Sequence, residues 1–130
     1  MPRIATLVAV ALLGASGLLG CDTFGPRSCP ASIEPGVEVE VVDGVTGAPV
    51  AGGSAGTARD GAYVDSLRAT RWRGDGVATA LSAAWGRAGV YRVEVRRQGY
   101  RDWARDDVRA RRGECGVETA RVRAALTPAP

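Results

Sequence analysis

Apolar and charged residues alternate one for one in two segments of this chain, and this period of two most restricts its fold. Valines alternate with glutamates from residue 37, and the segment 91–96 alternates Tyr or Val with Arg or Glu. Successive side chains of a strand point to opposite faces, so each segment would present one apolar and one charged face. After the first twenty residues, no stretch keeps apolar residues at helical spacing for the length of a helix. The sequence therefore predicts an all-β fold.

The first twenty-one residues have the composition of an export signal. A basic residue precedes the apolar run 4–13 and small residues follow it, which is the layout of a secretory signal. The segment ends in Leu18-Leu19-Gly20-Cys21, which resembles the lipobox of bacterial lipoproteins, where the chain is cut before a cysteine that becomes lipidated. We therefore expect residues 1–20 to be a signal peptide and Cys21 to carry the lipid. An ordinary cleaved signal and an uncleaved anchor are the alternatives.

The remainder of the chain is long enough for one domain. We divide it into a tether, residues 21–34, and a domain, residues 35–127. The full sequence has 17 basic residues, all of them Arg, against 14 acidic ones, for a net charge of +3. The signs alternate without a long basic block, so we expect no nucleic-acid partner.

Two of the three cysteines remain once Cys21 is assigned to the lipid. In an exported chain, an even number of cysteines favours a disulfide. We pair Cys29 with Cys115 and expect them beside each other at the start of the first and last strands. Closing so long a loop stabilises a domain by about 4 kcal/mol. A zinc site is the alternative, but two thiols in a chain without His do not supply the ligands of a structural zinc.

Turn residues divide the domain into about seven short strands, a spacing typical of a β-sandwich. Tyr91 and Tyr100 are interpreted as packing residues, and Gly99 as a residue with positive φ in the turn before Tyr100. We expect strands at 37–42, 62–67, 77–84, 90–96, 100–103 and 115–126, a long irregular loop at 68–76, a polar stretch at 104–113, and core positions at Val108, Val117, Val122 and Leu126.

Four strings of residues, in order, resemble the carboxypeptidase regulatory-like domain. They are Val-Glu-Val-Val-Asp-Gly-Val-Thr-Gly-Ala-Pro-Val (39–50), Asp-Gly-Ala-Tyr (60–63), Gly-Val-Tyr-Arg-Val-Glu-Val (89–95) and Gly-Tyr (99–100). The resemblance covers about residues 33–103. It implies an immunoglobulin-like, transthyretin-like β-sandwich of about seven strands that is not catalytic and serves as a folding, positioning or binding module.

The chain lacks residues that common catalytic mechanisms need. Without His there is no Ser-His or Cys-His pair, and the two unlipidated cysteines are assigned to the disulfide. Glu38 and Glu40 are interpreted as a solvated strand face. Asp102, Asp106 and Asp107 are interpreted as a charged loop, because their spacing is not that of a calcium loop. We therefore expect no enzymatic activity, no cofactor and no metal.

Aromatic residues beside Arg are the candidate contact residues. Arg71, Trp72 and Arg73 lie in the expected irregular loop, so they are the candidate ligand contacts, with Trp72 the best candidate for an exposed one. Trp85 and Trp103 flank strands and are expected to cover the ends of the core.

These features predict a membrane-anchored lipoprotein of the bacterial cell envelope, facing the periplasm or the cell surface. Its β-sandwich would be a non-catalytic binding or structural module with a protein or glycan partner. The alternatives are an accessory subunit that docks another envelope protein through a strand edge, and a carbohydrate-binding module. An exposed Trp72 beside a concave surface would favour a ligand, and a buried Trp72 would favour docking.

Overall fold

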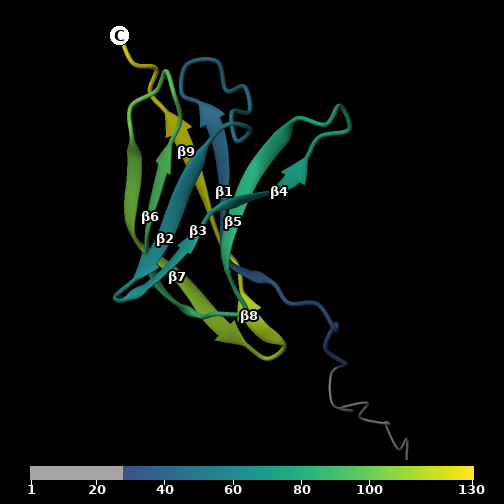
Figure 1. The fold of residues 1–130 in the computed structure, drawn as a ribbon. Helices are drawn as coiled ribbons and strands as arrows, with labels where there is room; N and C mark the ends of the chain where they lie inside the picture. The colour runs from purple at the N-terminus through teal and green to yellow at the C-terminus, as the bar shows by residue number, and fades with distance from the viewer. Residues whose placement is uncertain (1–27) are drawn as a thin grey trace, which may run out of the picture.

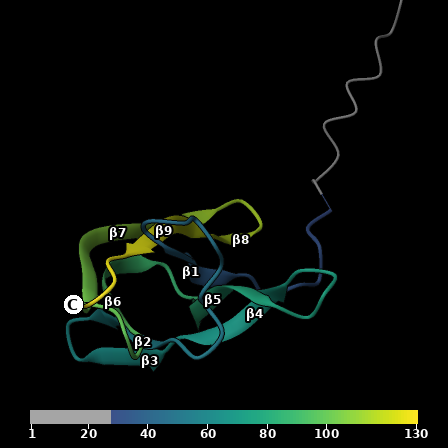
Figure 2. The ribbon, with the colours of Figure 1, turned by 90° about the horizontal axis from the view of Figure 1, so that it is seen from above.

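A computed structural model describes residues 28–130, and within this range the chain forms strands, turns and loops without a helix. The strands are β1 (Pro35–Asp43), β2 (Ala55–Asp60), β3 (Tyr63–Ser66), β4 (Arg68–Trp72), β5 (Ala78–Trp85), β6 (Gly89–Arg96), β7 (Trp103–Gly113), β8 (Gly116–Glu118) and β9 (Ala120–Leu126). A four-stranded sheet has the order β4-β5-β1-β9, and a five-stranded sheet the order β3-β2-β6-β7-β8 (Figures 1 and 2). The predicted all-β sandwich is confirmed.

Strand β1 lies inside the four-stranded sheet and carries the predicted alternation. It pairs with β5 in the antiparallel sense and with β9 in the parallel sense, so that Val39 lies opposite Leu81 and Val122. Val37, Val39 and Val41 are completely buried. The intervening glutamates point to the outer face of the sheet, as a period of two requires.

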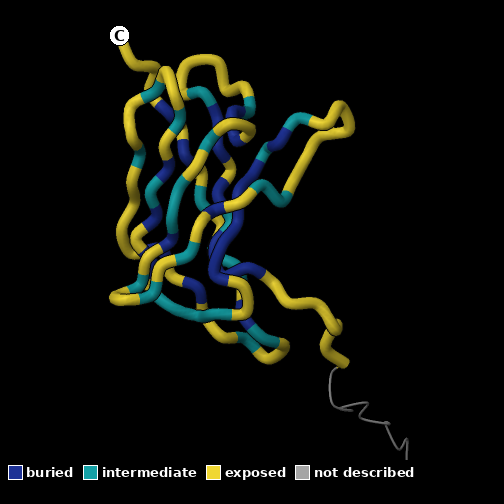
Figure 3. Tube along the Cα trace, in the orientation of Figure 1, coloured by how far each residue is buried: buried dark blue, intermediate teal, exposed yellow. Residues whose placement is uncertain are grey.

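The core lies between the two sheets. Tyr91, Val93 and Val95 of β6 are buried and belong to the same apolar cluster as the valines of β1 (Figure 3). The Tyr91 hydroxyl donates a hydrogen bond to the Arg87 carbonyl at 2.6 Å, so this buried tyrosine has a polar partner. Tyr100 is partly buried and packs against the cluster. Both tyrosines are therefore packing residues, as predicted.

The turn before Tyr100 follows the sequence prediction. Gly99 has a φ of 84°, which L residues with a side chain rarely adopt, and the Tyr100 amide donates to the Arg97 carbonyl at 3.1 Å. This turn directs the chain from β6 into β7.

The expected irregular loop at 68–76 is wrong. Its first five residues form β4, which pairs with β5, and only 73–76 form a turn. The Arg73 amide donates to the Val77 carbonyl at 2.9 Å and closes the hairpin. The pairing shifts register between Ala69 and Arg71 and again between Arg71 and Trp72. Each irregularity interrupts the period-two alternation, so the sequence of β4 does not resemble a strand.

The polar stretch at 104–113 is also a strand. It forms most of β7, which pairs with β6 and β8. Only Val108 and Ala110 are buried in this strand, since one of its faces is open to solvent. Val108 is in the core as predicted.

The expected final strand at 115–126 is divided between the two sheets. Its first part is β8, at the edge of the five-stranded sheet, and its second part is β9, beside β1. Val117 and Leu126 are buried, as predicted. Val122 lies opposite Val39 and packs against the core, but it is only partly buried because β9 is at the edge of its sheet.

The expected signal peptide, residues 1–20, and the expected lipidation site, Cys21, lie outside the described residues. Within residues 28–130, no helix is long and apolar enough to cross a membrane.

Candidate functional site

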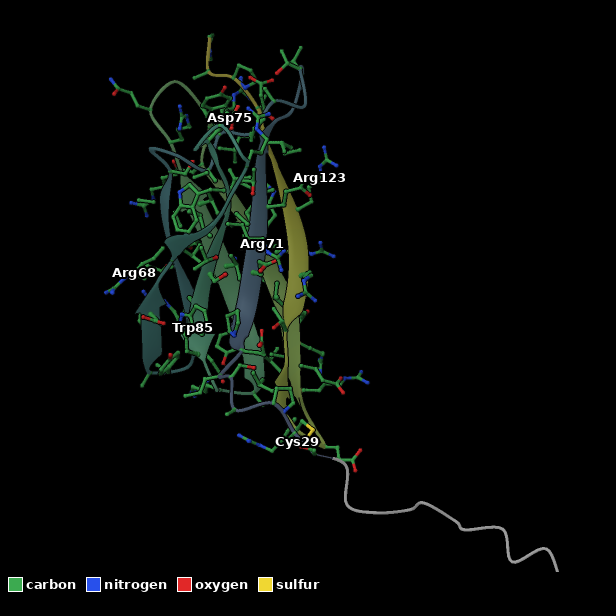
Figure 4. The ribbon with its side chains drawn as sticks, turned by 90° about the vertical axis from the view of Figure 1, so that its right-hand side faces the viewer. Cys29, Arg68, Arg71, Asp75, Trp85 and Arg123 are labelled. Carbon is green, nitrogen blue, oxygen red and sulfur yellow. A yellow bond between two sulfur atoms is a disulfide. The ribbon has the colours of Figure 1, made fainter. Side chains whose placement is uncertain are left out.

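Cys29 and Cys115 form a disulfide, with their Cα atoms 5.1 Å apart and 86 residues apart in sequence. The predicted pairing is confirmed. Cys115 lies in the turn directly before β8, and Cys29 lies six positions ahead of β1 at Pro35. The bond therefore fastens the segment that enters the domain to the turn between β7 and β8 (Figure 4).

The β4–β5 hairpin carries the predicted contact residue Trp72. Its turn projects beyond both sheets (Figures 1 and 2). Trp72 is 58% exposed, which decides between the exposed and the buried alternatives, although it ends a strand and does not lie in a loop. It pairs with Ala78 across the hairpin.

The three candidate contact residues do not form one cluster. The Arg71 Nε donates to Glu38 Oε2 at 2.9 Å, and the Arg73 Nη2 donates to Asp75 Oδ2 at 2.9 Å. Within residues 28–130, the cation–π contacts are those of Arg87 with two tyrosines. The Trp72 indole is therefore exposed, and the arginines on either side of it in sequence bind carboxylates.

Arg71 reaches Glu38 because the strand between them carries small residues. In the order β4-β5-β1, the Arg71 side chain crosses β5, where Ala80 lies opposite both Arg71 and Glu40. Ser82 lies opposite Glu38 and is buried, and its Oγ is 2.7 Å from Oγ1 of Thr70. These short side chains leave room above β5 for the guanidinium group.

Glu38 is held from both sides. In addition to Arg71, the Nε of Arg121 on β9 donates to Glu38 Oε1 at 3.3 Å, and the Glu38 side chain is only 13% exposed. The hydrogen bond to Glu38 raises the pKa of Arg71 above its usual value. The guanidinium group of Arg71 is therefore charged at any physiological pH.

A groove of about 500 Å³ lies over this ion-pair cluster on the outer face of the four-stranded sheet. Figure 4 looks onto this side of the molecule, with Arg71 near the middle of the sheet and Arg123 nearer its upper end. The residues that line it are Glu38, Glu40, Arg71, Thr79, Ala80, Arg121, Val122 and Arg123.

The groove offers hydrogen-bonding groups of both signs. Arg71 and Arg121 each use Nε for Glu38, and each guanidinium group has further N–H donors on its Nη atoms. Glu40 is exposed and adds carboxylate oxygens as acceptors. Such a surface is suited to a polar ligand with hydroxyl, amide or carboxylate groups.

Two of the three carboxylates expected in a charged loop face arginines. Asp106 accepts two hydrogen bonds from Arg92 Nη1 at 2.9 Å, and Asp102 Oδ2 lies 3.6 Å from Arg96 Nε. Within residues 28–130, no group of three His, Cys, Asp or Glu side chains is placed to hold a metal ion. These residues belong to ion pairs on the outer face of the five-stranded sheet.

The expectation that Trp85 covers an end of the core is wrong. Trp85 is 51% exposed. Ala84, directly before it, has a φ of 59°, so the regular alternation of β5 ends one residue before Trp85. Trp103, in contrast, is partly buried and packs against the core, as predicted.

The groove could not be predicted from the sequence. Glu38 was assigned to a solvated face because its neighbours in sequence alternate with it, but its partners come from β4 and β9. Only the order of the strands in the sheet brings these arginines to it.

Comparison of the chain with protein-family models, curated proteins and solved structures finds no match. The resemblance to the carboxypeptidase regulatory-like domain stays a prediction.

Proposed function

We propose that this chain is a lipoprotein of the bacterial cell envelope, anchored through a lipid on Cys21. Its β-sandwich is a non-catalytic binding module for a protein or glycan partner. The anchor is supported by the apolar run that ends in Leu-Leu-Gly-Cys, and the disulfide between Cys29 and Cys115 is typical of an oxidising compartment.

The observation that carries the binding proposal is the exposure of Trp72 on a projecting hairpin. Trp combines a large apolar area with one N–H donor, and it is enriched among residues that dominate binding energy. Paired strands hold the hairpin in a fixed position, so little conformational entropy is lost when Trp72 makes a contact.

The position of the hairpin also favours a contact with a partner. The described chain enters the domain at the end that contains Cys29, whereas Asp75 in the hairpin turn lies at the opposite end (Figure 4). A domain tethered at the first end would present Trp72 away from the membrane. Arg71, which precedes Trp72 in β4, lines the groove, and a concave surface at the base of the hairpin supports ligand binding over docking through a strand edge.

Site-specific photocrosslinking in cells tests this function. A photoreactive amino acid replaces Trp72 in one variant and Val45 in a control, because Val45 is 79% exposed but lies in the turn after β1. We expect one discrete adduct, with a protein or a glycan, from position 72 and none from position 45. Equal adducts from both positions, or none from position 72, would contradict the proposal.

A further inference from the structure

A second exposed apolar surface lies at the end of the domain that the tether enters. Ile33 is 69% exposed and Trp85 is 51% exposed. Figure 4 shows Trp85 in the lower part of the molecule, toward Cys29, and Figure 3 shows the exposed segment that leads into the domain there.

Backbone contacts hold the segments that carry these two side chains side by side. Pro35 pairs with Trp85, and the Gly86 amide donates to the Glu34 carbonyl at 2.9 Å. A Cβ atom on Gly86 would lie 3.2 Å from Cγ2 of Ile33, so Ile33 rests directly on the turn that follows Trp85. We call Ile33, Trp85 and Gly86 the tether-end surface.

The disulfide fixes the tether-end surface to the domain. A hollow of about 160 Å³ is lined by Ile33 and Gly86 together with Arg112 and Cys115. Since Cys115 is bonded to Cys29, the segment that carries Ile33 is fastened at both ends, at Cys29 and at β1. The segment that carries Ile33 is therefore held against the domain.

The length of the tether brings this surface to the membrane. This step rests on the proposed lipid at Cys21. Eight residue steps separate Cys21 from Cys29, and at most about 3.6 Å per step gives a reach of roughly 29 Å. The end of the domain that contains Cys29 therefore stays within contact range of the lipid headgroups.

We propose that the tether-end surface rests in the headgroup layer of the membrane that holds the lipid. Trp prefers this layer, because its ring is apolar and its N–H can bond to water or to a phosphate, and Ile33 adds apolar area. The surrounding charges are mixed, with Arg112 on one side of the surface and Glu34 and Glu118 around the adjacent hollow. The contact is therefore apolar in character, and zwitterionic phospholipid is sufficient for it.

Fluorescence quenching by brominated lipid tests the contact. The full-length lipidated protein, with Trp72→Phe and Trp103→Phe so that Trp85 is the only Trp, is reconstituted into phosphatidylcholine vesicles with brominated acyl chains. We expect Trp85 emission to fall to about half or less of its value in unbrominated vesicles. The matched control has Trp72 as its only Trp, through Trp85→Phe and Trp103→Phe, and we expect no quenching.

Hydrogen exchange on the unsubstituted protein provides a second measurement, in case Trp103→Phe disturbs the core. Residues 31–35 and 84–88 should exchange more slowly in the vesicle-bound protein than in the Cys21→Ala protein in solution, whereas residues 73–76 should not change. Absence of both quenching and protection in acylated, vesicle-bound protein would overturn the contact and leave the anchor intact. Absence of an acyl group on the parent protein would overturn both. Equal quenching of Trp72 and Trp85 would also contradict the proposed orientation.

Discussion

The hydroxyl of Tyr100 donates a hydrogen bond to Oδ2 of Asp43 at 2.7 Å, across 57 residues of sequence. The other oxygen of Asp43 accepts from the amides of Val45 at 2.7 Å and Thr46 at 2.8 Å. One carboxylate therefore closes the turn after β1 and ties it to the turn between β6 and β7. These hydrogen bonds hold the pKa of Asp43 below its usual value. The Thr46 amide has the largest effect, followed by the Tyr100 hydroxyl and the Val45 amide.

The stability of the protein should depend on the ionisation of Asp43. The pKa of Asp43 is lower in the folded state than in the unfolded state, so its ionised carboxylate stabilises the fold. This stabilisation is present above the unfolded pKa and is lost as the pH falls through the folded pKa. We expect Asp43→Asn to lower the urea midpoint at pH 7 and to reduce its decline toward pH 3. Urea unfolding from pH 7 to pH 3 measures both effects. Equal acid dependence of the parent and Asp43→Asn would contradict this prediction.

Stability at alkaline pH tests the same hydrogen bond through the ionisation of Tyr100. The hydrogen bond to Asp43 raises the pKa of Tyr100. A raised folded pKa gives stability that is present below the unfolded pKa, about 10 for Tyr, and lost as the pH rises through the folded value. Tyr100→Phe should therefore show a smaller alkaline loss than the parent, measured by urea unfolding between pH 8 and pH 11.

Removal of the disulfide should destabilise the domain by about 4 kcal/mol, because the bond closes a long loop between two cysteines that are 86 positions apart in sequence. The double variant Cys29→Ser and Cys115→Ser, compared with the parent in urea unfolding, measures this loss. Parent protein under reducing conditions is the control and should match the variant. A parent whose stability does not change on reduction would contradict the prediction.

Gly56→Ala should destabilise the five-stranded sheet. A Cβ on Gly56 would overlap the carbonyl oxygen of Glu94 on β6 and would lie 2.9 Å from Cδ1 of Leu67. The backbone of a paired strand moves little, so we expect a loss of about 2 kcal/mol or more. Gly74→Ala is the matched control, because nothing lies within 4 Å of its Cβ position, and it should change stability by less than about 0.5 kcal/mol.

Cys21→Ala should release the protein from the membrane fraction and abolish labelling by a fatty-acid analogue, since the thiol is the proposed site of acylation. Cell fractionation with metabolic labelling measures both. A parent protein that stays in the membrane fraction without any label would indicate an uncleaved anchor.

Trp72→Ala should leave folding almost intact, because the residue is 58% exposed. If Trp72 is the main contact, the variant should bind the partner identified by photocrosslinking more weakly by about 1 to 3 kcal/mol. Trp85→Ala is the control for loss of an exposed indole and should bind that partner as the parent does. A Trp72→Ala protein that unfolds would instead assign Trp72 to the core.

The sequence predicted those strands and turns whose local residue pattern matches the burial of the side chains in the folded domain. The alternation around Val39 and Val93 predicted two central strands, and Gly99 predicted a turn with positive φ. β4 was missed because two register shifts break its alternation. β7 was missed because it buries only a valine and an alanine among its charged residues.

The candidate site could be predicted only in part. Its polar surroundings in sequence made Trp72 the best candidate for an exposed contact, but the choice between exposure and burial needed the structure. The contact between Arg71 and Glu38 spans three strands, and it depends on small side chains on β5. No local pattern carries this information, because the order of strands in a sheet is decided by packing over the whole domain.

The parallel pairing of β1 with β9 determines when the domain can fold. Val37 lies opposite Ala120, so β1 has only β5 as a neighbour until the segment from residue 120 to residue 126 is present. Pairing between segments so distant in sequence is slow, since the intervening chain must first be ordered. A nascent chain that ends before residue 120 would leave the backbone N–H and C=O groups along this edge of β1 unpaired. The four-stranded sheet is therefore completed only once its last strand, residues 120–126, has been synthesised.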